Sequence, residues 1–149
     1  MKSSKTGWIS VVTILILVSP AVALFIDVQF IGGADIAAYS TWAWGEGTPM
    51  PNHEVERAAR ETIEKEMSAK GYARVDGEAD CQIAIHARKD EWFDGGLLKI
   101  EVLDGTTGQV VWRGKAEGEV TVRSTGKRQK LAQRTVKKMF KKFPDKRTG

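Results

Sequence analysis

Cysteine and histidine are scarce in this sequence of 149 residues, and their scarcity limits the chemistry that the chain can carry. Cys81 is the only cysteine, so an intramolecular disulfide and a cysteine-rich zinc site are both excluded. The two histidines, His53 and His86, are too few for most metal clusters. The sequence therefore implies no disulfide-linked partner, no metal and no cofactor. Otherwise the composition is that of an ordinary globular protein, long enough for one domain with a core.

Acidic residues are almost missing from the C-terminal part of the chain. Residues 123–149 include eleven Lys or Arg residues and one acid, Asp145. Residues 24–122 include ten basic and eighteen acidic residues, which gives this part a net charge of about −8. The overall charge of +4 therefore conceals an acidic body followed by a basic segment.

The first 23 residues have the pattern of a signal peptide. Two lysines form a positively charged n-region, residues 8–18 form an apolar h-region, and Ala-Val-Ala at 21–23 fits a signal peptidase site. We predict cleavage after Ala23, which leaves residues 24–149 as a single exported domain in the periplasm or beyond. The alternative is a retained anchor in the inner membrane, because residues 8–26 are long enough to span it.

Two kinds of hydrophobic periodicity predict the fold of the exported part. Alternation with period two predicts strands at 25–30, 39–44 and 80–88, and a hairpin within 95–120 whose turn is at 104–108. A helical period predicts helices at 52–70, with Asn52 as N-cap and Gly71 at the C′ position, and at 127–143. Because each helix has one apolar stripe, both are expected on the same face of the sheet. The predicted fold is α+β, an antiparallel sheet of about five strands with two helices packed on one face.

Six short pieces of this sequence, in order along the chain, resemble the bacterial domain-of-unknown-function family 4136. They are Tyr39-Ser-Thr-Trp-Ala-Trp44, Lys70-Gly71-Tyr72, Ala79-Asp80, Gly96-Leu97 with Asp104, Val111-Trp112-Arg113-Gly114 and Phe143-Pro144. The resemblance implies an exported, often lipid-anchored envelope protein of unassigned activity. The chain departs from the family in one respect, because residues 19–26 contain no lipobox cysteine. This departure argues against a lipid anchor.

Combinations of residues that would indicate catalysis or metal binding are weak. Cys81 and His86 fall on opposite faces of their strand, and Cys81 shares its parity with Ile83, which predicts a buried and inert thiol. The acids of the 89–96 loop, Asp90, Glu91 and Asp94, do not have the spacing of an EF-hand. The chain is therefore not expected to be an enzyme. An enzyme whose site combines acids distant in sequence remains the alternative, with Asp80, Asp90, Glu91 and Asp104 as candidates.

Aromatic side chains offer a second kind of candidate site. Four tryptophans could form a sugar-stacking platform: Trp42, Trp44, Trp92 and Trp112. Trp112 lies on the inward parity of its strand, so we expect it to anchor the core, whereas Trp42 and Trp44 fit either role. Trp92 and Phe93 lie in a charged loop and are predicted to form an exposed aromatic contact.

The basic C-terminal helix is the strongest functional candidate. The favoured function is a non-catalytic bacterial cell-envelope module that binds an envelope component or an anionic surface. The predicted contact residues are Lys130, Arg134, Lys137, Lys138, Lys141 and Lys142. For these charges themselves the sequence favours the simpler interpretation, in which they form the solvated face of a helix that packs on the sheet and pair with the acidic body. Contact with an anionic surface is the more specific hypothesis. Binding to nucleic acid is not expected, because export removes the chain from the cytosol.

Overall fold

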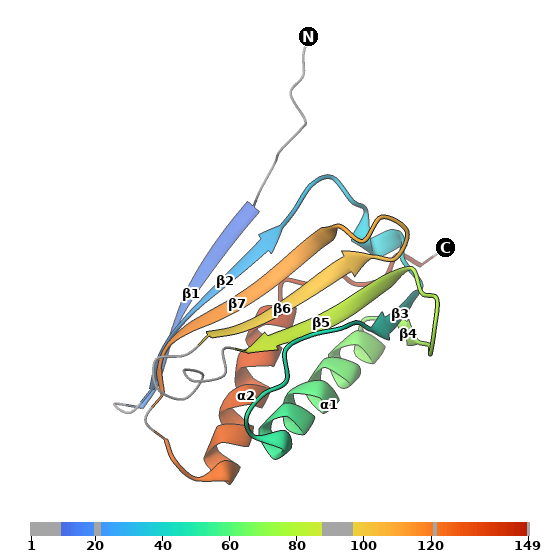
Figure 1. Cartoon of the computed structure of the whole chain (residues 1–149). Coiled ribbons are helices and arrows are strands. Elements are labelled where there is room, and N and C mark those ends of the chain that lie inside the picture. The colour runs from blue at the N-terminus through green and yellow to red at the C-terminus, as the bar shows by residue number, and fades with distance from the viewer. Residues whose placement is uncertain (1–9, 20–21, 88–96, 121, 149) are drawn as a thin grey trace.

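Figure 1 shows the computed structural model of the chain, in which a seven-stranded sheet carries both helices on one face. The structure describes residues 10–19, 22–87, 97–120 and 122–148. In chain order the elements are β1 (Ser10–Ser19), β2 (Val22–Phe30), the 3-10 turn η1 (Ile36–Ala38), β3 (Thr41–Trp44), α1 (His53–Ala69), β4 (Ala73–Arg74), β5 (Cys81–Ala87), β6 (Leu97–Asp104), β7 (Val110–Val120) and α2 (Thr125–Phe140). The α+β class and the shared helix face agree with the prediction.

The sheet has the strand order β1-β2-β7-β6-β5-β3-β4 and is mixed. The first five strands in this order pair antiparallel, whereas β3 pairs parallel with both β5 and β4. The predicted antiparallel pairing therefore holds for these five strands, whereas the prediction is wrong in the number of strands and in the direction in which β3 pairs with its neighbours. The reason is that α1 connects β3 to the next strand and carries the chain back along the length of the sheet. Strands joined by a helical crossover of this kind run in the same direction.

The predicted signal segment contributes the edge strand of the uncut chain. In β1, residues 10–17 pair in unbroken antiparallel register with residues 23–30, and the hydroxyl of Thr13 donates to Asp27 Oδ1 at 2.6 Å. The segment is rich in Val, Ile and Leu, and β-branched residues favour a strand where a partner strand is available. Signal peptidase cleavage after Ala23, which would remove β1, remains a prediction.

The two helices begin and end where local capping chemistry directs them. The Asn52 side chain accepts hydrogen bonds from the N–H groups of Glu54 and Val55, at 3.0 and 3.2 Å, and so caps α1 as predicted. Gly71, just beyond α1, has a φ of 97°, a conformation that glycine adopts without strain. Helix α2 begins at Thr125, two residues before the predicted start, because the Ser124 hydroxyl caps it.

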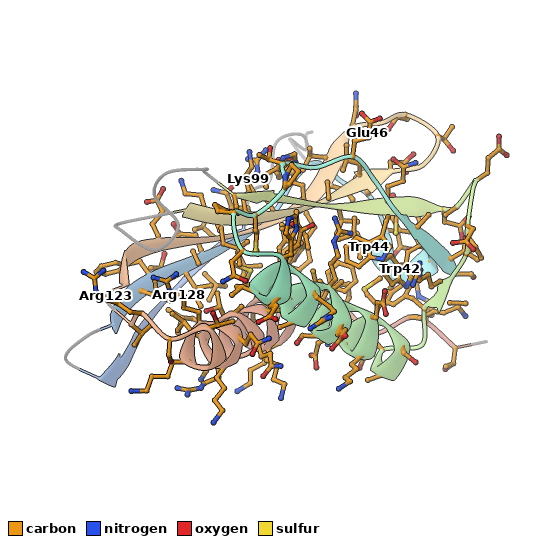
Figure 2. The ribbon with its side chains drawn as sticks, turned by 60° about the horizontal axis from the view of Figure 1, so that its bottom comes forward. Trp42, Trp44, Glu46, Lys99, Arg123 and Arg128 are labelled. Atoms are coloured by element: carbon orange, nitrogen blue, oxygen red, sulfur yellow. The ribbon has the colours of Figure 1, made fainter. Side chains whose placement is uncertain are left out.

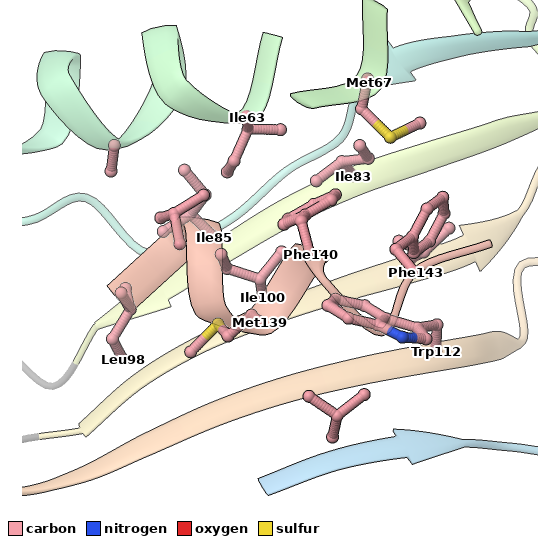
Figure 3. Packing of buried hydrophobic residues seen from close by; sticks show 14 of the residues in the cluster. Ile63, Met67, Ile83, Ile85, Leu98, Ile100, Trp112, Met139, Phe140 and Phe143 are labelled. Atoms are coloured by element: carbon pink, nitrogen blue, oxygen red, sulfur yellow. The ribbon is translucent and has the colours of Figure 1, made fainter. Parts of the chain in front are cut away.

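The core lies between the sheet and the helices, as Figure 3 shows. Trp112 of β7 is 0 % exposed, and its ring lies 5.3 Å from that of Phe140 and 5.2 Å from that of Phe143. The predicted structural role of Trp112 is therefore confirmed. Gly114 provides the space for this ring, because a Cβ atom at that position would lie 2.9 Å from both Trp112 Cη2 and Met139 Sδ.

Candidate functional site

The outward face of α2 is a line of basic side chains. Its buried residues, among them Ala132, Val136 and Phe140, pack against the sheet and α1. Basic residues follow the opposite side at intervals of three and four, and Figure 2 shows nitrogen-tipped side chains projecting away from the sheet. We define this basic face as Lys127, Lys130, Arg134, Lys137, Lys138, Lys141 and Lys142.

The basic face brings together all six predicted contact residues and adds one. Lys138 is half-buried and the other six side chains are exposed. Lys127 was missed by the sequence prediction, which placed it at the very start of the helix; it occupies the first full turn because α2 begins at Thr125. Lys141 and Lys142 follow the last helical residue, Phe140, and extend the face beyond the helix end.

None of these seven cations forms an ion pair with another described residue. The ion pairs nearest to them in sequence involve other cations, Lys70 with Asp145 at 3.8 Å and Arg147 with Asp35 at 2.8 Å. Within the described part of the chain, pairing with the acidic body therefore does not account for the basic face. Among the described residues, the face is a concentration of positive charge without acidic partners, on a helix that packs into the core.

Two of the four acids proposed for an alternative enzyme site, Asp80 and Asp104, accept hydrogen bonds within the fold. Asp80 Oδ2 accepts hydrogen bonds from the N–H groups of Ser40 and Thr41, at 2.7 and 3.2 Å. Asp104 Oδ2 accepts from the Tyr39 hydroxyl at 2.6 Å, and its Oδ1 accepts from two N–H groups of its own turn. These hydrogen bonds lower the pKa of both carboxyl groups, so each is held as an ionised acceptor.

Cys81 is an interior residue, as its strand parity predicts. Its side chain is 0 % exposed, and burial raises the pKa of the thiol to about 12. His86 lies on the other face of β5, where it contacts Glu101. The two side chains are therefore not brought together, and the thiol stays protonated at neutral pH.

The described members of the predicted platform, Trp42, Trp44 and Trp112, do not form an open aromatic surface. Trp42 is 1 % exposed and Trp112 is buried, so neither ring offers a face to a ligand. Trp44 is half-buried, and its indole N–H donates to Glu64 Oε1 at 3.2 Å. The guanidinium of Arg60 lies 4.5 Å from the centre of the Trp44 ring, which covers one face in a cation–π contact. Trp92 and Phe93 lie outside the described residues.

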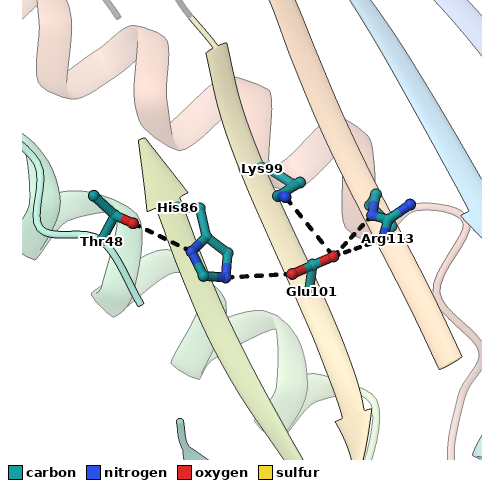
Figure 4. A network of polar contacts seen from close by, with 5 residues as sticks. All are labelled: Thr48, His86, Lys99, Glu101 and Arg113. Carbon is teal, nitrogen blue, oxygen red and sulfur yellow. Dashed lines mark hydrogen bonds and ion pairs between the residues drawn. The ribbon is translucent and has the colours of Figure 1, made fainter. Parts of the chain in front are cut away.

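A polar network on the helix-free face of the sheet was missed by the sequence analysis. Figure 4 shows Glu101 of β6 at its centre, only 8 % exposed. Arg113 donates to Glu101 Oε2 from Nη2 at 2.7 Å and from Nε at 2.9 Å, while His86 Nε2 lies 3.3 Å from Oε1. Lys99 Nζ lies 3.9 Å from the same carboxylate. The network satisfies a carboxylate that would be costly to bury alone, which gives it a structural role.

A shallow groove of about 810 Å³ lies beside β3 and β4. Arg74, Asp76 and Glu78 contribute charges of both signs to its lining. Arg74 is already paired with Glu64 at 2.8 Å and with Asp76 at 3.8 Å. Among the residues that the structure describes, no three His, Cys, Asp or Glu side chains gather as metal ligands would. The acids of the 89–96 loop lie outside the described residues.

The described residues define an α+β protein with a basic helical face, in which Asp80 and Asp104 hold parts of the backbone. The chain belongs to the family described as Domain of unknown function (DUF4136), whose model matches residues 27–145. This finding confirms the resemblance seen in the sequence. No curated protein sequence matches the chain. Over the described helices, none has the length and apolar character needed to cross a membrane.

Solved structures share the fold at low sequence identity. The PelC dodecamer from Paraburkholderia phytofirmans is similar with a TM-score of 0.53 and 12 % identity, over 78 % of this chain and 94 % of that chain. A variant of the same dodecamer gives a TM-score of 0.50 and 13 % identity, over 78 % and 96 %. A PDZ domain protein from Parabacteroides distasonis gives a TM-score of 0.50 and 17 % identity, over 74 % of this chain and 33 % of that one. At these identities the likeness establishes the fold alone.

Proposed function

We propose that this protein is an exported, non-catalytic module that docks on an anionic envelope surface through the basic face of α2. The ligand class is the anionic headgroup of a lipid. The observation that carries the proposal is the line of seven basic side chains that have no acidic partner among the described residues. Charges that serve only solubility are normally interspersed with charges of the other sign, whereas α2 contains no acid.

The energetics favour a membrane surface as the target. Each Lys or Arg close to an anionic leaflet contributes about 1 kcal/mol, and the attraction decays within a Debye length of about 8 Å at physiological salt. Seven cations on one face therefore suffice for reversible attachment without any inserted segment. The long lysine side chains tolerate an irregular layer of headgroups, because each ammonium acts as a point charge on a flexible stem.

The rest of the fold supports docking rather than catalysis. Helix α2 is fixed to the sheet by its buried residues, so its charges are presented from a rigid element. Asp80 and Asp104 are occupied by backbone N–H groups and by Tyr39. The Cys81 thiol is buried and protonated. These arrangements give Asp80 and Asp104 structural tasks and leave the Cys81 thiol unreactive in the folded protein.

The test is co-sedimentation of the exported protein with vesicles of anionic and of neutral phospholipid. We expect binding to anionic vesicles at low salt and none to neutral ones. A variant with Lys137→Glu, Lys138→Glu and Lys141→Glu should lose this binding. The matched control, Arg57→Glu with Lys65→Glu and Lys115→Glu, changes the net charge equally but leaves the basic face intact.

The two variants separate a local surface from overall charge. If the control loses binding as fully as the α2 variant, net charge alone drives attachment and the proposed face is wrong. If the wild type and the α2 variant bind alike, α2 only packs on the sheet. Far-UV circular dichroism of each variant confirms that the fold is retained.

A further inference from the structure

The outer edge of β2 is a strand-pairing surface that the predicted cleavage would uncover. In the uncut chain β1 covers it, pairing with β2 from Ser10 opposite Phe30 to Leu17 opposite Ala23. The other edge of β2 is held by β7, with Asp27 opposite Lys115 and Val28 opposite Gly114. Figure 1 shows β1 as the outermost strand, so only this one strand separates β2 from the edge of the sheet.

The backbone groups of β2 that would be uncovered can be identified. The N–H of Ile31 donates to the carbonyl of Val111 at 3.0 Å, so Ile31 points its hydrogen-bonding groups toward β7. Successive residues of a strand point these groups to alternate sides. Leu24, Ile26 and Val28 therefore point theirs toward β1. Removal of β1 leaves these N–H and C=O groups without strand partners.

Residues 24–30, Leu-Phe-Ile-Asp-Val-Gln-Phe, lack the features that protect an edge strand. They contain no proline and no lysine, and Asp27 is their only charge. Phe25 is 52 % exposed on the helix-free face. Edge strands without prolines, lysines or bulges recruit a further strand. The segment also has the same residue pattern as β1, with apolar residues on the helix side and mixed residues on the other side. A second copy of the segment could therefore take the place of β1.

We propose that β2 of the processed protein pairs antiparallel with β2 of a second copy and joins the two sheets into one. The inference rests on the predicted cleavage after Ala23 and is independent of lipid binding. An antiparallel pair is self-complementary about a twofold axis, so a single strand can supply both sides of the interface. When the twofold axis passes through a residue, even-numbered residues of one copy face even-numbered residues of the other. Leu24, Ile26 and Val28 of both copies therefore remain on the helix side.

Charge patterns on the helix-free face test this pairing without altering the core. In a variant with Phe25→Asp and Gln29→Asp, residues 25, 27 and 29 are all acidic. Acids then oppose acids whether the twofold axis lies at Ile26, Asp27 or Val28. An axis at Asp27 would place the two Asp27 carboxylates opposite each other in the wild type, so the proposed axis lies at Ile26 or Val28. The matched variant, Phe25→Lys with Gln29→Lys, alternates the signs and places Lys opposite Asp27 in both of these registers.

The experiment measures the mass of the exported protein in solution by light scattering over a dilution series, after its N-terminus has been sequenced. We expect a processed dimer whose dissociation constant rises at least about tenfold in the Asp variant but not in the Lys variant. A monomeric processed protein, an N-terminus that retains residues 10–19, or equal weakening in both variants would each overturn the proposal. So would a dimer that persists in the Asp variant, since another surface would then hold it together.

Discussion

Truncation of Trp112 tests the account of the core in the most detail. The indole is 0 % exposed and packs against Phe140 and Phe143. Replacement by alanine removes this contact and leaves a cavity between the sheet and α2. For a fully buried tryptophan the expected loss is about 3–5 kcal/mol in the free energy of unfolding.

Replacement of Trp112 by phenylalanine should be far milder, for a reason specific to this site. The Trp112 indole N–H is buried and has no hydrogen-bond partner among the described residues. A buried donor without a partner costs about 1–3 kcal/mol. Phenylalanine removes that donor, and the smaller ring loses about two buried methylene equivalents, worth roughly 1.6 kcal/mol. Because these effects offset one another, we expect Trp112→Phe to lie within about 1 kcal/mol of the wild type.

Urea unfolding followed by far-UV circular dichroism measures both variants on one scale, provided that the m-value is unchanged. The assigned packing is supported if the free energy of unfolding is highest for the wild type, slightly lower for Trp112→Phe and lowest for Trp112→Ala. A loss below about 1 kcal/mol for Trp112→Ala would show that the ring is exposed. A Phe variant as unstable as the Ala variant would show that the indole N–H has an acceptor.

Three further predictions follow from single features of the chain. Gly114→Ala should lower the free energy of unfolding in urea by about 1–3 kcal/mol, because the added Cβ would lie 2.9 Å from Trp112 and Met139. The control Gly126→Ala should not destabilise the protein, because a Cβ there meets nothing within 4 Å. Burial raises the pKa of the Cys81 thiol from 9.0 to about 12, so a thiol reagent should react with Cys81 only when the protein unfolds. The free energy of unfolding should also fall as the pH rises from about 9 toward 12, because only the unfolded chain then loses the thiol proton. Rapid labelling of the folded protein would contradict this. Mass spectrometry of the exported chain should find Leu24 at the N-terminus, and a chain that starts at Met1 would indicate a retained anchor.

Elements with strong local signals could be predicted from the sequence. Asn52 and Gly71 mark the ends of α1, and alternation places Cys81 and Trp112 in the interior. Each of these predictions depends on residues close together in the chain, where periodicity and capping chemistry act directly. The hairpin of β6 and β7 was predictable for the same reason, since its turn is formed by Asp104 and its neighbours.

Features that depend on pairing between distant segments could not be predicted. The parallel pairing of β3 with β5 arises from the crossover through α1, and the two-residue strand β4 is too short to show a period. The Glu101 network needs the register of three strands, which brings His86 and Arg113 to one carboxylate. The available signal was that Lys99 and Glu101 lie on the same face of a strand whose other face is buried. Sequence alone did not show that Glu101 itself is nearly enclosed.

The central claim is that an electrostatic surface on α2 attaches the protein to anionic lipid. A salt titration of the exported protein bound to anionic vesicles tests this most directly. The account predicts strong binding at low ionic strength that is nearly abolished at about 0.5 M salt, where the Debye length is far shorter than at physiological salt. Binding that does not change across this range would contradict the claim, because attachment would then depend on apolar or specific contacts rather than on the basic face.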